Sequence, residues 1–171
     1  MRVLQGISLS LLLIVMNCAP TQKVDTTENT VWTFISSKEI EEDDSFPTEY
    51  MMLKLDNTLL EEKLNQSETP LISVPTHNGD FINVRLEDSG TMSPALAAKF
   101  PNIKSFQGTE IGNNSTTIRV DKNTSGLFAM ITRDGEVYFI NPIEKGSTTY
   151  IVYDKKYAKR GSNPFADQVI K

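Results

Sequence analysis

The segment LISVPTHNGDFINVRL (residues 71–86) decides the fold class, because it joins two short apolar runs through a tight turn. Asn78-Gly79 lies between the runs, and this dipeptide is the strongest short-range signal for a β-hairpin, since a type I′ turn requires positive φ at both central residues. The second run alternates in character, with three apolar residues on one face: Ile82, Val84 and Leu86. Such alternation is typical of an antiparallel strand with one buried face.

Further short apolar runs flanked by turn residues predict additional strands, at residues 50–55, 117–121, 127–131, 137–140 and 149–153. Asp134-Gly135 joins two of them as a second hairpin. Residues 127–131 and 137–140 are almost continuously apolar, which favours burial on both faces and hence central positions in the sheet.

Two short helices are predicted between these strands. Asp56 or Asn57 caps the first, which extends to about Gln66 and carries an apolar stripe of leucines. Ser93 followed by Pro94 begins the second, which covers Ala95 to Phe100. The fold class is therefore mainly β (α+β): an antiparallel sheet or sandwich of about six to eight strands with two short helices, over residues 48–154.

Composition excludes several classes of function. The chain has 171 residues, a formal charge of −5, one Cys and one His. One Cys excludes a disulfide framework, and one His excludes a two-histidine metal helix. The acidic balance argues against nucleic acid as a partner. His77 lies in the first hairpin, where turn chemistry accounts for it without a catalytic role. The residues show no catalytic constellation and no cofactor site, so an enzyme is not predicted.

The N-terminus predicts export. Arg2 precedes the apolar run from Ile7 to Met16, which is too short to span a bilayer but suits a secretory signal peptide over residues 1–17. Cys18 follows at the position that a bacterial lipoprotein signal would modify, although Asn17 is unusual before it. We expect either a lipoprotein at the outer membrane or cell surface, or a secreted protein. The membrane is then contacted only through the N-terminal lipid anchor.

The segments on either side of the β domain have distinct compositions. Residues 18–47 are polar and acidic, which predicts a flexible linker. Residues 155–171 form a basic, turn-rich tail that contains Lys159-Arg160-Gly161. Lys159 and Arg160 form either a proteolytic processing site or a cluster of solubilising charges, and the residues alone favour the latter.

An ordered set of motifs resembles a known family. The set comprises LKLDNTLLEEKLNQ (53–66), RLEDSGTMSPALAAKFPNIKSFQG (85–108), TTIRVD (116–121), GLFAMI (126–131), VYFINP (137–142) and YIVYDKK (150–156). It is similar to the N-terminal, propeptide-like region of secreted bacterial reprolysin-like zinc metallopeptidases, which reads ESPVMxPxLAxKFPxIKTYxGQG, TIRFD, GFHAMI and VYIDP. The H-E-x-x-H motif of their catalytic domain does not occur in this chain.

The resemblance implies a non-catalytic module that assists the folding of a reprolysin-like zinc metallopeptidase domain or inhibits it. The resemblance also shifts the interpretation of Lys159 and Arg160 toward a proteolytic processing site, because a propeptide is removed from its enzyme. Glu87 and Asp88, beside the best-matching segment, are the candidate inhibitory contacts. The alternative is a stand-alone surface lipoprotein that uses the β domain as a binding or structural module. Neither hypothesis requires a bound metal or cofactor.

Overall fold

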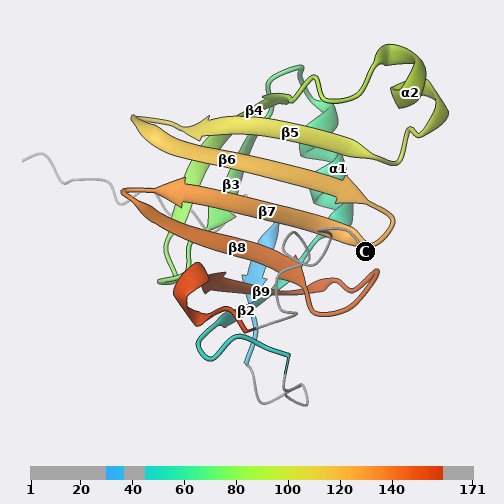
Figure 1. Ribbon diagram of the computed structural model, residues 1–171. Helices are drawn as coiled ribbons and strands as arrows, with labels where there is room; N and C mark the ends of the chain where they lie inside the picture. Colours follow the sequence, from blue (N-terminus) through green and yellow to red (C-terminus); the bar gives the residue numbers. More distant parts are fainter. Residues whose placement is uncertain (1–29, 37–44, 160–171) are drawn as a thin grey trace, which may run out of the picture.

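The computed structural model describes residues 30–36 and 45–159. Within them, the chain forms a single antiparallel sheet with strand order β1-β2-β9-β8-β7-β6-β5-β4-β3 (Figure 1). The strands are β1 (Trp32–Phe34), β2 (Met51–Leu55), β3 (Leu71–Pro75), β4 (Phe81–Asp88), β5 (Lys104–Glu110), β6 (Asn113–Asn123), β7 (Gly126–Arg133), β8 (Glu136–Pro142) and β9 (Thr149–Asp154). The predicted fold class is confirmed, with nine strands in the described part of the chain.

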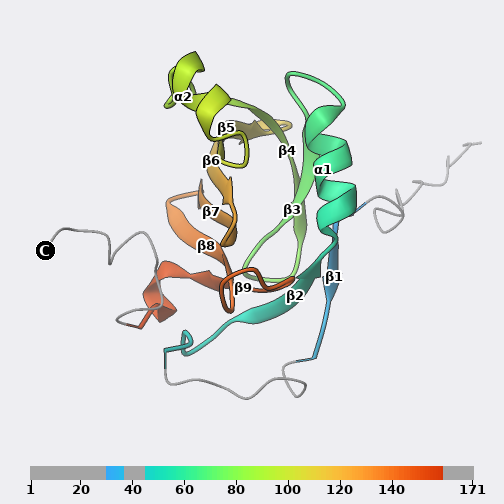
Figure 2. The same ribbon diagram turned by 90° about the vertical axis from the view of Figure 1, so that its right-hand side faces the viewer.

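The sheet curls until its two edge strands, β1 and β3, approach each other beside helix α1 (Asn57–Asn65), as Figure 2 shows. Phe34 of β1 meets Phe81 of β4 edge to face, with ring centroids 5.5 Å apart. Leu60 and Leu64 of α1 are buried in the same core as the inward side chains of the strands. The helix therefore helps to close a barrel-like core that the sheet alone leaves open.

Both helices begin where their sequences predict. The Asp56 carboxylate accepts a hydrogen bond from the Leu59 backbone N–H at 2.9 Å and caps α1. Ser93 caps α2 (Pro94–Lys99), which projects from the sheet between β4 and β5. Helix α2 buries none of its residues, so it does not contribute to the core. A 3₁₀ turn, η3 (Lys155–Tyr157), follows β9.

The first hairpin forms at the predicted place, but with a different turn. Pro75 pairs with Phe81, which leaves a five-residue loop from Thr76 to Asp80. Gly79 has φ of +94° while Asn78 does not have positive φ, so this is not the predicted type I′ turn. The type I′ pattern occurs instead in the second hairpin, where Asp134 and Gly135 have φ of +53° and +85°.

The position of β1 shows that the predicted linker, residues 18–47, is wrong in one part. Residues 18–47 were predicted to form a flexible linker, yet Trp32–Phe34 pair with β2, and Val31 and Trp32 are buried in the core. A three-residue strand carries too little periodicity to be distinguished from an apolar patch in a polar segment. The acidic run at residues 39–44 and the predicted signal peptide lie outside the described residues.

The central position predicted for the most apolar strands is confirmed. Strands β7 and β8 lie in the middle of the sheet. The outward face of β8 is covered as well, because Phe139 belongs to a second buried apolar cluster with Met52, Ile151 and Tyr153. No helix in the described part of the chain is long and apolar enough to cross a membrane.

Candidate functional site

The sequence-predicted contacts Glu87 and Asp88 lie at the end of β4, where they line a groove of about 660 Å³. The groove lies between the strand ends and the α2 arm, by which we mean residues 89–103. Its apolar lining comes from the helices, the arm and the strand ends: Leu64, Pro70, Met92, Ala97, Ile103 and Phe106. The structure thus places both carboxylates at the rim of an apolar depression.

Hydrogen bonds give both carboxylates a defined direction. Glu87 Oε1 accepts a bond from the Gln107 side chain of β5 at 3.0 Å. Asp88 Oδ1 accepts one from the Gly90 backbone N–H at 2.7 Å, at the point where the α2 arm begins. Gly90 has φ of +65°, a conformation that glycine adopts readily, and this turn directs the arm away from the sheet.

The α2 arm presents apolar side chains to solvent. Leu96, Phe100 and Ile103 are 44%, 42% and 41% exposed. The helix is short and capped at its start by Ser93, so its form does not depend on packing its apolar side chains into the core. Exposed apolar groups that gather beside a groove are typical of an interaction surface.

The other predicted sites are only partly described. Lys159 is exposed and follows η3 near the end of the described residues. Cys18 and Arg160 lie outside the described residues, so lipidation and proteolytic processing stay predictions. An exposed basic residue beyond the last strand is accessible to a trypsin-like protease, as the predicted processing site requires.

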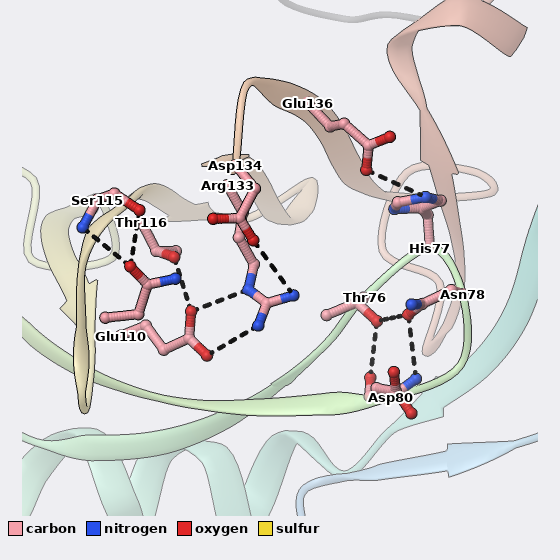
Figure 3. Close-up of polar contacts among 11 residues, drawn as sticks. Thr76, His77, Asn78, Asp80, Glu110, Ser115, Thr116, Arg133, Asp134 and Glu136 are labelled. Atoms are coloured by element: carbon pink, nitrogen blue, oxygen red, sulfur yellow. Dashed lines mark hydrogen bonds and ion pairs between the residues drawn. The ribbon is translucent and has the colours of Figure 1, made fainter.

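A second polar cluster, absent from the sequence predictions, lies at the opposite end of β4, around the first hairpin (Figure 3). His77 packs its ring against Tyr138 at 5.2 Å between centroids, and its Nε2 lies 3.7 Å from Glu136 Oε2. Asp154 at the end of β9 completes the group. Because β8 and β9 pair with Tyr138 opposite Asp154, the sheet register brings these distant residues together.

Glu110 and Arg133 form a neighbouring ion pair in Figure 3. Arg133 Nε donates to Glu110 Oε2 at 2.9 Å, and the Thr116 hydroxyl donates to the same oxygen at 2.6 Å. Burial alone would raise the pKa of the Glu110 carboxyl. The hydrogen bonds from Thr116 and Arg133, together with the arginine charge, outweigh burial and hold this pKa below its ordinary value.

Burial has the opposite net result for Tyr138. Its side chain is 1% exposed, and desolvation raises the pKa of its phenol to about 12. Asp154 behaves like Glu110: burial raises the pKa of its carboxyl, but the backbone N–H and ammonium of Lys156 more than offset this and lower it. Tyr138 is therefore neutral and Asp154 ionised at neutral pH.

We expect the free energy of unfolding to decrease as the pH falls below about 5, because Glu110 has a folded-state pKa below its unfolded value. Its contribution is fully present above the ordinary value of 4.5 and is lost as the pH falls through the lowered folded-state pKa. Urea unfolding at pH 7, 5, 4 and 3 measures this dependence.

The Glu110→Gln variant should be less stable than the wild type at pH 7 and should lose less further stability on acidification. Glu144→Gln is the matched control, because Glu144 is exposed in the turn after β8. Equal pH slopes for wild type and Glu110→Gln would show that the Glu110–Arg133 pair does not contribute to the acid dependence.

Comparisons with known proteins add no identification. No family model, no curated protein and no solved structure matches this chain. The resemblance to the reprolysin-like propeptide region therefore stays a prediction from the sequence motifs.

Sequence reasoning assigned His77 to a turn, which is correct, but it did not find its neighbours. Glu136 begins β8 directly after the turn of the second hairpin and Asp154 ends β9, so no local spacing relates either residue to His77. The sequence indicates only that each of these polar residues lies at the end of a predicted strand. The strand order is needed to show that those strand ends are neighbours in the sheet.

Proposed function

We propose that this chain is an exported, non-catalytic module that binds a reprolysin-like zinc metallopeptidase domain, assisting its folding or inhibiting it. The observation that carries the proposal is the position of residues 85–108, the segment with the most extensive motif. It comprises the second half of β4, the α2 arm and most of β5, and so includes the exposed apolar residues of the arm and both predicted carboxylates.

The groove favours an occupant of defined chemistry. The larger share of its lining surface is apolar, and its three carboxylates, Glu68, Glu87 and Asp88, outnumber its one ammonium, Lys104. An extended apolar segment of the peptidase domain that carries one basic side chain would fit this groove. Its apolar side chains would be buried against the apolar lining, and its positive charge would pair with the carboxylates at the rim. Leu96 and Phe100 on the adjoining arm would extend this apolar contact.

The position of Asp88 supports an inhibitory contact. Its carboxylate is oriented by the Gly90 N–H at the base of the arm. A carboxylate is a common zinc ligand and competes with the water that a catalytic zinc keeps in its open position. We therefore favour Asp88 over Glu87 for a contact with the peptidase metal, since Glu87 is held against Gln107 on the sheet.

Inhibition of a co-expressed reprolysin-like peptidase domain tests the proposal. The full chain with Cys18→Ser is titrated against the purified peptidase domain, and the inhibition constant is compared with those of two variants, Leu96→Ser and Phe100→Ser. Each should weaken inhibition by about tenfold or more, since a buried apolar interface anchor contributes over 1.4 kcal/mol. Asp88→Asn should reduce inhibition further than Glu87→Gln.

Ile111→Ser is the matched control. Ile111 is also an exposed apolar residue, 48% accessible, but it lies in the β5–β6 turn, away from the arm. It should alter the inhibition constant by less than about twofold. Absence of both inhibition and co-purification would overturn the proposal and favour the alternative, a surface lipoprotein with a different binding or structural role.

A further inference from the structure

The cluster around His77 has the composition of a metal site. One nitrogen of His77 and one carboxylate oxygen each of Glu136 and Asp154 all lie within 4.8 Å of one another. Ligand atoms around a zinc ion at about 2.0–2.2 Å stand closer together than this, so modest side-chain rotation completes the geometry. Glu136 has that freedom, because its side chain is 56% exposed.

Unsatisfied buried polar groups provide a second, independent observation. His77 Nδ1 and the Tyr138 hydroxyl are among the buried side-chain polar atoms that have no hydrogen-bond partner in the described part of the chain. Tyr138 is 1% exposed and packs directly on the imidazole. Buried polar atoms without partners are costly, and a native cluster that contains two of them points to a bound group that the protein chain does not itself supply.

The surrounding backbone fixes the position of two ligands. The Thr76 hydroxyl bonds the Asn78 side chain and donates to the Asp80 carbonyl at 3.1 Å (Figure 3). The Thr76 backbone N–H donates to the same carbonyl at 2.8 Å, and these bonds together close the loop that carries His77. Asp154 ends β9 opposite Tyr138 and is 6% exposed. Such preorganisation reduces the entropy lost when an ion binds.

The ammonium group of Lys156 competes with a metal ion for the carboxylate of Asp154. The ammonium lies 3.0 Å from Asp154 Oδ2, but the lysine side chain is 56% exposed. Because the lysine side chain is more than half exposed, its ammonium can move into solvent when a divalent ion takes its place beside Asp154.

We propose that His77, Glu136 and Asp154 bind a divalent first-row transition metal, with Zn²⁺ as the representative ion. One imidazole and two carboxylates match the ligand preferences of such ions, whereas Ca²⁺ and Mg²⁺ prefer oxygen ligands alone. Three protein ligands leave coordination positions for water. The ion joins the first hairpin to the ends of β8 and β9, at the opposite end of the barrel-like core from the α2 arm.

Zinc titration of the full chain tests this assignment. The protein carries Cys18→Ser, which removes the only thiol, has no polyhistidine tag and is freed of metal with EDTA. Calorimetry should give one tight equivalent of Zn²⁺. Because the chain contains one His, its imidazole NMR signals belong to His77 alone, and they should shift and saturate at one equivalent.

Single variants distinguish zinc binding at this site from non-specific zinc binding to surface carboxylates. Loss of a ligand should weaken zinc binding by about tenfold or more in His77→Ala and Glu136→Gln, since even the loss of an outer partner of a metal ligand has effects of that size. Lys156→Met should tighten binding, because it removes the competing ammonium. Glu136 is exposed, so its variant remains informative if His77→Ala fails to fold.

Asp80→Asn and Glu144→Gln are the matched controls, because both remove an exposed carboxylate, the first from the same hairpin loop. Their zinc affinities should equal that of the parent. Unchanged imidazole signals at one equivalent, or equal affinities in Glu136→Gln and the controls, would overturn the proposal and leave only non-specific binding to surface carboxylates.

Discussion

Gly108→Ala should be among the most destabilising single substitutions in this protein, lowering the free energy of unfolding by about 3 kcal/mol or more. Gly108 pairs with Leu86 of β4 on one side and with Ile118 of β6 on the other. A Cβ atom at this position would lie 2.3 Å from the Arg85 carbonyl oxygen and 2.9 Å from Leu86 Cδ2. The first contact is with backbone, so the strands themselves would have to separate.

Close approach of a neighbouring strand is a recognised reason for glycine inside a β-strand. Here the neighbouring strand is β4, whose Arg85 carbonyl group and Leu86 side chain occupy the space beside Gly108. Guanidinium unfolding measures the loss, and Thr109→Ala is the matched control because Thr109 is the exposed next residue of the same strand. The control should lose less than about 1 kcal/mol. Equal losses in the two variants would show that β4 and β5 are not closely opposed at Gly108.

Tyr150→Ala should lower the free energy of unfolding by about 4 kcal/mol, the cost typical of removing a large buried aromatic side chain. Tyr150 is 1% exposed and meets Trp32 edge to face with ring centroids 5.3 Å apart. It therefore connects β9 to the short edge strand β1. Without the ring, Trp32 would border a cavity, and we expect β1 to detach first.

A second substitution divides the effect of Tyr150 into two parts. The Tyr150 hydroxyl accepts a hydrogen bond from the buried Leu127 N–H at 3.0 Å. Tyr150→Phe keeps the ring but leaves this N–H without a partner, which should cost about 1–3 kcal/mol. Leu71→Ala is the control, since Leu71 is 54% exposed and its truncation should change stability by less than about 1 kcal/mol. Urea unfolding followed by tryptophan fluorescence reports on the same contact, and a Tyr150→Ala loss no larger than that of the control would contradict this assignment.

Local sequence patterns were sufficient for most of the elements. The hairpins at 71–86 and 127–140, the caps at Asp56 and Ser93, and the central position of β7 and β8 all follow from turn residues, capping residues and runs of apolar side chains. Strand β5 was missed, because Lys104–Glu110 has little apolar alternation and is half-exposed along its length. Its place in the sheet is set by pairing with β4 and β6 on either side.

The candidate site, too, was predicted only in part from the sequence. Glu87 and Asp88 are close together in the chain and lie beside a recognisable motif, so the sequence could nominate them, but only the fold shows that they border a groove next to exposed apolar residues. The hypothesis of a peptidase-binding module stays a proposal that the inhibition experiment tests.

The sequence by itself determined the antiparallel β class, the two helices and their caps, because turns, caps and apolar periodicity act over a few residues. Only the tertiary structure decided that Trp32 joins the core, that β4 and β5 approach too closely for any side chain at Gly108, and that His77, Glu136 and Asp154 meet. These three features depend on strand order and register. That order is fixed by the burial of the whole core, which no short segment contains.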